Sequence, residues 1–272
     1  MPFFGPLDAE HATDEVVLPD NFADPLEDNE PLRYRLHREC HVDKYGGPDK
    51  VRQLVRRYWG LVSQVDRSVG AILAALDGAG LADDTIVVYT SDHGDMMGSH
   101  HMVEKCVMYQ EALRIPWLMR VPWMGRGQKI IDAPVSQVDL VPTLLDLLGS
   151  RAGEKLPGHS LVSVLEGGKP AEDHVFIQWS PGQGAMKLKR GTKLATPAEL
   201  KRIARERTRT VISPDGWKLC LSDIAKGQLF HLKTDPGETT NLFDSGRHDD
   251  VIARLTARIH EWQAETGDEA KV

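Results

Sequence analysis

Asp92 and His93 are the residues whose types and spacing could most clearly do chemistry. They follow the apolar, β-branched run Thr85-Ile-Val-Val-Tyr-Thr-Ser, and Gly94 comes next. Open α/β sheets bind ligands just beyond the carboxyl ends of buried strands. A carboxylate suits Ca²⁺, Mg²⁺ or Mn²⁺, and an imidazole moves the preference toward Mn²⁺ or Zn²⁺. The pair therefore suggests two ligands of a divalent cation, and the alternative is a polar turn that ends a strand.

Lys105 and His100 lie in the loop that follows this pair. Lys105 comes 13 residues after Asp92. A lysine ammonium beside a metal site would stabilise an anionic substrate such as a sulfate or phosphate. His100 could donate a hydrogen bond to the same anion or protonate a leaving oxygen. Both could instead be ordinary loop residues.

Predicted elements before and after the pair would position it. Apolar residues at steps of three and four predict a helix over residues 49–77, which Pro48 favours at its start. Strands are predicted at 85–91 and 115–121, and a helix at about 137–148. Helix, short link and buried strand form an α/β unit, which favours a mainly parallel sheet flanked by helices. Residues 1–48 are expected to be irregular, with the acidic stretch from Asp20 to Glu30 as a solvated surface loop.

The pattern changes after about residue 166. Short strands separated by turn residues predict a small antiparallel sheet, and an amphipathic helix is expected at about 247–265. The strands are predicted at 175–179, 208–213, 217–221 and 228–232. We therefore expect an α/β fold in two parts. Residues 1–165 carry the mainly parallel sheet, and residues 166–272 form a C-terminal subdomain.

Composition limits the function classes. The chain has 272 residues, 41% hydrophobic and 27% charged, which is ordinary for a globular protein. The net charge of −7 does not favour a nucleic-acid partner. No apolar run approaches the roughly 18 residues that span a bilayer, and no signal peptide is recognised. Three widely spaced cysteines make a disulfide framework unexpected. The compartment is cytoplasmic if this start is native, and otherwise unknown.

Several motifs together resemble the sulfatases of the alkaline-phosphatase superfamily. The first group surrounds the Asp-His pair, and the others follow in order to about residue 245. They are Thr90-Ser-Asp92-His93-Gly94, Gly98-Ser-His100, Glu104-Lys105, Tyr109-Gln-Glu-Ala-Leu-Arg114-Ile-Pro116, Val138-Asp139-Leu-Val-Pro142-Thr143, Pro157-Gly158-His-Ser160-Leu161 and Gln228-Leu-Phe230 through Asn241-Leu242. The resemblance implies the C-terminal half of an alkaline-phosphatase-like α/β core.

The resemblance also implies roles for the residues singled out above. Asp92 and His93 would be metal ligands, with Ca²⁺ as the expected ion and Mn²⁺ or Zn²⁺ as alternatives. Lys105 would contact the sulfate oxygens, and His100 would line the pocket. The implied substrate is a sulfated small molecule or glycan. Because His93 stands where many sulfatases have Asn, a phosphodiester or phosphonate monoester hydrolase is the alternative.

The sulfatase nucleophile motif is absent. Sulfatases convert the Cys or Ser of Cys/Ser-x-Pro-x-Arg to formylglycine, and neither form occurs in this chain. The early Asp-Asp metal pair of the family is missing as well. We therefore expect the isolated chain to be inactive, as a truncated fragment, a split subunit or a degenerate module. Its partner would be the missing N-terminal half or a second copy in a homo-oligomer.

Overall fold

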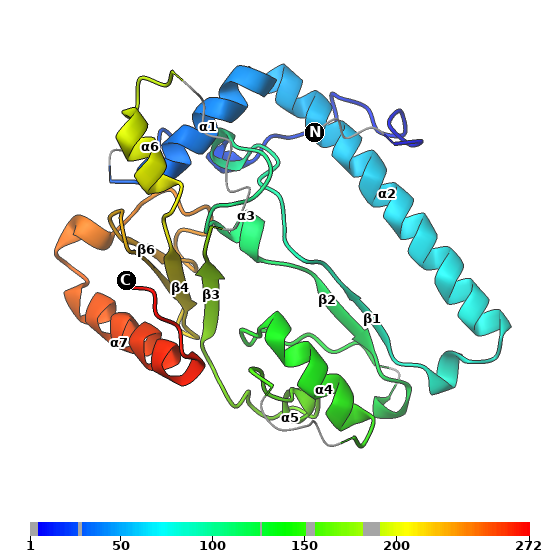
Figure 1. Ribbon diagram of the computed structural model, residues 1–272. Coiled ribbons are helices and arrows are strands. Elements are labelled where there is room, and N and C mark those ends of the chain that lie inside the picture. The colour runs from blue at the N-terminus through cyan, green and yellow to red at the C-terminus, as the bar shows by residue number, and fades with distance from the viewer. Residues whose placement is uncertain (1–4, 27–28, 126, 151–155, 182–190) are drawn as a thin grey trace. The chain divides into compact units, whose positions relative to one another are not determined.

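The computed structural model describes residues 5–26, 29–125, 127–150, 156–181 and 191–272, without the side chains of 41–45 (Figure 1). The chain forms two compact units, Met1–Pro25 with Leu36–Gln128 and Leu26–Arg35 with Lys129–Val272. The helices are α1 (Leu32–Tyr45), α2 (Pro48–Gly78), α3 (Gln110–Leu113), α4 (Leu140–Leu147), α5 (Val162–Leu165), α6 (Pro197–Ile203) and α7 (Asp249–Thr266). The strands are β1 (Val87–Thr90), β2 (Trp117–Arg120), β3 (Val175–Trp179), β4 (Thr208–Ile212), β5 (Trp217–Ser222) and β6 (Gln228–His231).

The α/β fold class and the small C-terminal antiparallel sheet are confirmed. Each predicted helix and strand is present within about three residues of its expected ends, and the largest difference is at the start of α4, where residues 137–139 form a 3-10 turn. The predicted division at residues 165 and 166 stays a prediction. In this structure α4 and α5 belong to the second unit.

Helix α2 follows from the regular spacing of its apolar residues. Pro48 occupies its first turn, where the missing N–H costs no intrahelical hydrogen bond. The N-terminal half of the helix is buried through Val51 and Val55, which form a core cluster with Val16. Further along, apolar side chains including Val62, Val65 and Ile72 are exposed.

The two strands of the first unit pair differently from the prediction. β1 and β2 are antiparallel, with Thr90 opposite Trp117, and a mainly parallel sheet is not found in the described part of the chain. A parallel pair needs a crossover connection, which is usually a helix. Residues 91–116 contain only a 3-10 turn at Ser99–His101 and the single turn of α3, neither of which can cross the sheet, so the chain leaves and re-enters this sheet at the same end. The intervening segment thus acts as one long hairpin loop.

The expectation of an irregular start and a solvated acidic stretch was wrong in two respects. Residues 32–45 form α1, whose buried positions include Arg33 and His37 as well as Tyr34 and Leu36. A search for apolar periodicity misses a helix whose buried face is partly polar. Within the acidic stretch, Asp24 and Glu30 are buried, because each carboxylate has a hydrogen-bond partner inside the fold.

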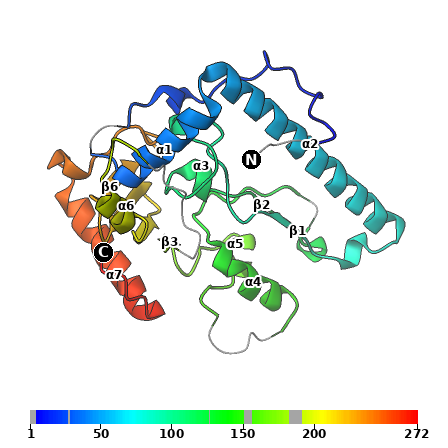
Figure 2. The same ribbon diagram turned by 45° about the horizontal axis from the view of Figure 1, so that its top comes forward.

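The second unit contains a four-stranded antiparallel sheet in the order β3-β4-β5-β6, with α7 along one face (Figures 1 and 2). Alternate residues of the central strands point toward α7. The fully buried cluster consists of Val211, Leu219, Leu229, Leu255 and Ile259. Burying these side chains removes apolar surface from water, which supplies the main driving force for this unit.

The opposite side-chain set of the same strands is also buried, and it includes the charged Lys218 as well as the apolar Phe230. Lys218 donates to Glu238 over 2.5 Å, and neither side chain is exposed. Burial is the main reason that the pKa of the Cys220 thiol is raised to about 11. The charge of Lys218 lowers this pKa and the charge of Glu238 raises it. The three cysteines are free thiols, as expected from their spacing.

A buried arginine anchors the chain end to the sheet. Arg209 donates to both carboxylate oxygens of Asp268, from Nε over 2.7 Å and from Nη2 over 2.6 Å. Gln263 donates to the same carboxylate over 2.7 Å. These charge-assisted bonds lower the pKa of Asp268 to about 2.

Asp268 is therefore expected to make stability depend on acidity. Because its folded-state pKa is below the unfolded value of about 4, its contribution is present above pH 4 and is lost as the pH falls toward 2. Urea unfolding of wild type and Asp268→Asn should differ at pH 7 and converge near pH 2. The control Asp244→Asn removes an exposed ion pair with Lys226 and should change stability by less than about 0.5 kcal/mol. A wild-type advantage that persists at pH 2 would contradict this prediction.

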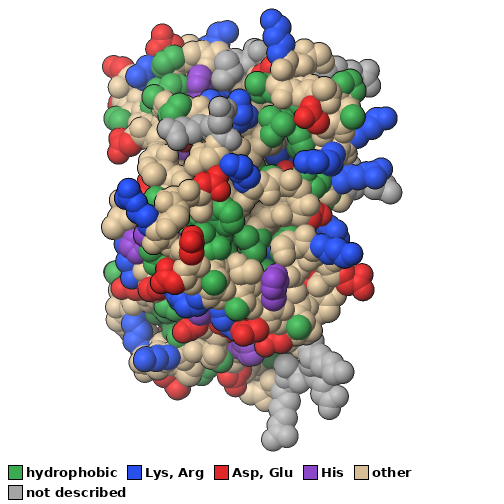
Figure 3. Space-filling model, turned by 90° about the vertical axis from the view of Figure 1, so that its left-hand side faces the viewer, with side chains coloured by type: hydrophobic (Ala, Val, Ile, Leu, Met, Phe, Trp, Pro, Cys, Tyr) green, Lys and Arg blue, Asp and Glu red, His purple; other side chains and the backbone are tan. Residues whose placement is uncertain are grey.

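No helix in the described part of the chain is long and apolar enough to cross a membrane. Figure 3 shows a face on which Lys and Arg side chains are interspersed with Asp and Glu. That face therefore carries no continuous field of one sign. The absence of a nucleic-acid partner stays a prediction.

Candidate active site

The Asp92–His93 pair directly follows β1, where the sequence placed it. Asp92 is the more open of the two, with 82% of its side chain exposed. Its Oδ1 accepts from the backbone N–H of His93 over 2.9 Å and from the Ser91 hydroxyl over 3.3 Å. The backbone hydrogen bond is the main reason that the pKa of Asp92 is lowered. The carboxylate is thus held ionised, and both of these bonds go to Oδ1 rather than to Oδ2.

The ring of His93 is fixed by its own backbone surroundings. Nδ1 lies 2.8 Å from the carbonyl oxygen of Gly94, and since a carbonyl only accepts, Nδ1 must carry a proton. In the neutral ring, Nε2 then bears the lone pair. This nitrogen lies 3.3 Å from Asp92 Oδ2. Two donors at that spacing can share one ion whose bonds measure about 2.0–2.5 Å.

Gly94 is required by a close approach of two backbone segments. Its N–H donates to the carbonyl of Ala112 over 2.9 Å. A Cβ at this position would lie 1.9 Å from the carbonyl oxygen of Glu111. The glycine therefore serves to admit the returning chain, rather than to provide a left-handed turn.

Asp95 closes the loop that leads to Lys105. Its Oδ1 accepts from the backbone N–H of Met97 over 3.1 Å and from that of Glu104 over 2.9 Å. The N–H of Met96 also donates to the carbonyl of Glu104 over 2.8 Å. These bonds hold the backbone of Glu104 against residues 95 and 96, shortly after the Asp-His pair. Lys105 is the next residue, so its backbone begins close to that segment.

Lys105 is half-buried, and it stabilises the Asp95 carboxylate electrostatically. Burial is the main influence on Asp95 and raises its pKa, against the opposing effect of the two backbone donors and Lys105. Tyr58, on α2, also faces this charge, and its pKa is raised first by burial and then by Asp95 and Tyr89. The neighbourhood of Lys105 is therefore partly desolvated.

His100 lies in the interior. Its side chain is fully buried, Nδ1 bonds the Asp24 carboxylate, and Nε2 lies 3.2 Å from Nδ2 of Asn21. The ring stacks on Tyr109 with centroids 3.8 Å apart. Both nitrogens are thus engaged within the protein. The proposed contact of His100 with an anion stays a prediction.

Asn21, Asp24 and Asp95 are residues of this neighbourhood that the sequence did not single out. Asp24 was hidden because its acidic surroundings suggested a solvated loop. Asp95 carried a weak signal, since it comes two residues after a proposed ligand. No short-range pattern links residues 21 and 24 to residue 100, because their contact depends on the tertiary fold.

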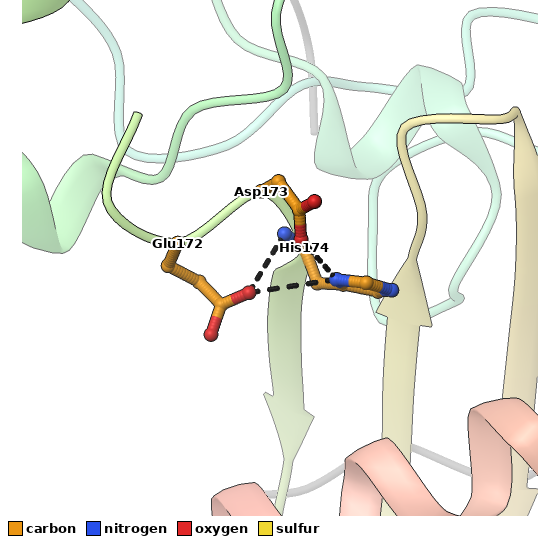
Figure 4. Close-up of side chains that lie close together, drawn as sticks. All are labelled: Glu172, Asp173 and His174. Atoms are coloured by element: carbon orange, nitrogen blue, oxygen red, sulfur yellow. Dashed lines mark hydrogen bonds and ion pairs between the residues drawn. The ribbon is translucent and has the colours of Figure 1, made fainter. Parts of the chain in front are cut away.

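A further group of potential ligands lies at the start of β3 (Figure 4). Glu172, Asp173 and His174 have one ligand atom each within 4.8 Å of the others. His174 Nδ1 lies 2.6 Å from Asp173 Oδ1, and Glu172 pairs with Arg258 over 2.8 Å. The ligand atoms already have partners within the protein, so we describe the group as a cluster of side-chain hydrogen bonds and ion pairs.

Comparisons with known proteins show what the whole chain is similar to. Residues 10–150 match the family model described as Sulfatase. A choline-sulfatase of Rhizobium meliloti is 27% identical over 270 residues, which are 97% of this chain and 47% of that protein. The solved structure of a 2-O GAG sulfatase superposes with a TM-score of 0.75 at 26% identity, over 99% of this chain and 54% of the other. For the phosphonate monoester hydrolase of Agrobacterium radiobacter the TM-score is 0.68 at 26% identity, over 80% and 42%. The chain spans about half the length of the curated relatives it matches, and corresponds to their C-terminal part.

Proposed function

Because the chain belongs to the sulfatase family of the alkaline-phosphatase superfamily, we propose that it supplies the metal and anion wall of a site that hydrolyses sulfuric esters. The observation that carries the proposal is the pairing of two donors. His93 Nε2, which carries the lone pair, and Asp92 Oδ2 lie 3.3 Å apart just after the end of β1. A carboxylate and a neutral imidazole suit a divalent ion.

The two donors fit the ion that the family uses, though they fill only part of its shell. Ca²⁺ is the ion that the family resemblance implies, whereas the imidazole moves the preference of the donor set toward Mn²⁺ or Zn²⁺, the two alternatives. A bound divalent ion supplies charge neutralisation for an oxyanion. The chain's own residues keep Asp92 ionised and hold His93 in the coordinating tautomer, which removes the cost of arranging them upon binding.

Lys105 is the cation that would face the anionic group of the substrate. The loop closure through Asp95 brings its backbone back toward the Asp-His pair. Partial desolvation strengthens an ammonium's attraction for a sulfate oxygen. His100, with both nitrogens engaged, would act on the leaving oxygen only after losing the Asn21 contact. We therefore assign anion contact to Lys105 first and to His100 second.

The nucleophile is not assigned to this chain. None of its cysteines or serines stands in Cys/Ser-x-Pro-x-Arg, so formylglycine has no precursor here. A bond-breaking step needs a nucleophile from elsewhere in the assembled protein. We expect the chain by itself to bind a metal without turnover.

The substrate class we propose is a sulfated small molecule or glycan. It is supported by relatives described as a choline-sulfatase and a 2-O GAG sulfatase. A phosphonate or phosphodiester is the second candidate, since a phosphonate monoester hydrolase is similarly close. Turnover of an aryl sulfate against an aryl phosphonate monoester, with the nucleophile-bearing half of a sulfatase supplied, separates the two. A preference for the phosphonate would replace sulfate as the substrate.

Asp92→Ala is expected to weaken metal binding at least tenfold, because it removes one of the two donors. The measurement is calorimetric titration of the chain with Ca²⁺ and with Mn²⁺. Asp84→Ala, which removes an exposed carboxylate before β1, is the matched control and should bind like wild type. Equal affinity in Asp92→Ala and wild type would show that the pair is only a polar turn.

The remaining part of the fold is proposed to pack on the exposed apolar side chains of the first unit. Val62, Val65 and Ile72 are spaced by three and seven residues on α2, and 52%, 46% and 66% of them are exposed. Tyr89 and Leu118 are cross-strand partners on one exposed face of β1 and β2. An unpaired two-stranded sheet is marginal in water. The partner we propose is the polypeptide that corresponds to the other half of the relatives.

Val65→Lys is expected to weaken that association at least tenfold, since it places a charge in an apolar contact. Sedimentation of the chain with the unmatched half of the choline-sulfatase measures the complex. Gln64→Lys, on an adjacent exposed position, is the control. If the chain alone instead sediments as a dimer that Val65→Lys dissociates, a second copy covers this surface. Association unchanged by Val65→Lys would show that this apolar surface is not the interface with either partner.

A further inference from the structure

The loop between Gly94 and Cys106 is held in an uncommon backbone conformation. Five of its non-glycine residues have a positive φ: Met97, His100, His101, Glu104 and Cys106. The left-handed region costs an ordinary residue roughly 1 kcal/mol or more. Such a loop persists only if contacts with the rest of the protein offset this cost. The relevant contacts are therefore those made by the residues with a positive φ.

The strongest of these contacts are made by His100. With φ at 52° and a fully buried ring, it donates from Nδ1 to the Asp24 carboxylate, whose side chain is only 5% exposed. Nε2 accepts from Nδ2 of Asn21 over 3.2 Å. The same amide nitrogen donates to Glu111 over 3.0 Å, which identifies it as the amide's donor end. The network therefore has one consistent direction, with the proton on Nδ1 and the lone pair on Nε2.

The neighbouring loop residues are held by the same segment, residues 19–24. The ring of His101 packs on Phe22 with centroids 4.6 Å apart, and its Nε2 lies 3.0 Å from the carbonyl of Gly46. The backbone of Gly98 approaches Pro19 and Phe22. The segment is itself anchored, because Arg38 donates to the carbonyl of Asp24 over 2.6 Å. Together, these contacts of Gly98 and His101 restrain the tip of the loop on several sides.

We propose that Asp24 is a positioning residue for Lys105. Through its hydrogen bond to His100 it fixes one tautomer of that ring and holds the strained loop, so that the loop returns at Glu104 and presents Lys105 beside the Asp-His pair. Asn21 supports it from the other ring nitrogen. The functional meaning of this placement rests on the proposed function, whereas the placement itself does not.

The test uses the full chain labelled with ¹⁵N-histidine. Long-range ¹H–¹⁵N spectra should show His100 as the neutral Nδ1–H tautomer, identified by the signal that His100→Gln lacks. In Asp24→Ala this signature should be lost, and acylation of Lys105 by an amine-reactive reagent, followed by mass spectrometry, should change at least threefold. Asp24→Asn keeps an oxygen acceptor and should restore both readouts. Asp20→Ala removes an exposed carboxylate of the same segment and should match wild type.

Asn21→Ala is a second variant, which decides the question if Asp24→Ala does not fold. It should keep the Nδ1 proton, shift the Nε2 resonance and change Lys105 acylation in the same direction. Folded variants with wild-type His100 spectra and a wild-type Lys105 rate would overturn the proposal, as would an Nε2–H tautomer in the wild type. A failure of the proposed function is seen separately, as metal binding that Asp92→Ala leaves unchanged.

Discussion

Gly94→Ala is expected to destabilise the protein by about 3 kcal/mol, at the upper end of the usual cost of overpacking. The added methyl group would lie 1.9 Å from the carbonyl oxygen of Glu111 and 3.0 Å from its carbon. Backbone atoms cannot rotate away as the end of a side chain can. The two segments must therefore separate, and the hydrogen bond from Gly94 to Ala112 is weakened. Urea unfolding measures the loss.

Gly70→Ala is the matched control, because the same substitution should have the opposite sign. Gly70 lies within α2, and a Cβ there would meet nothing within 4 Å. Replacing an exposed helical glycine with alanine stabilises by about 0.5–1 kcal/mol, since the unfolded chain loses conformational freedom. If both variants were equally stable, the close approach at residue 94 would not constrain the fold.

Glu238→Ala is expected to cost about 3–5 kcal/mol, the loss typical of breaking a buried ion pair. The Lys218 ammonium is fully buried, and its bond to Glu238 measures 2.5 Å. Without the carboxylate, the charge stays in a low-dielectric interior that hydrates it poorly. Alanine would also have to adopt the left-handed φ of 51° at this position. Thermal and urea unfolding should both register the change in the second unit.

A double-mutant cycle separates the pair from the surrounding packing. Lys218→Met alone leaves a buried carboxylate and should be about as costly as Glu238→Ala. The double variant Lys218→Met with Glu238→Ala removes both charges and should cost much less than the sum of the two single variants. Costs that simply add would mean that the two charges do not depend on one another.

Local sequence patterns were enough to identify α2, α7 and the six strands. In the two helices apolar residues recur at the helical spacing, as Val51 and Val55 do in α2, whereas the strands were identified as short apolar runs bounded by turn residues. The Asp-His pair after β1 was equally visible, because a polar pair that ends a β-branched run is a local signal. Its assignment as a metal site stays a prediction. The close approach of Glu111 that requires a glycine at position 94 was not visible in the sequence.

The tertiary structure alone decided which distant residues meet. The antiparallel pairing of β1 with β2 depends on the path of residues 91–116, which no short window of sequence encodes. Burial of Asp24 depends on His100, 76 residues away, because a carboxylate leaves water only where a donor compensates it. Helix α1 likewise buries Arg33, which pairs with Glu206 from a remote part of the chain. Local patterns report what one element requires, whereas polar burial is settled by partners that only the folded chain brings together.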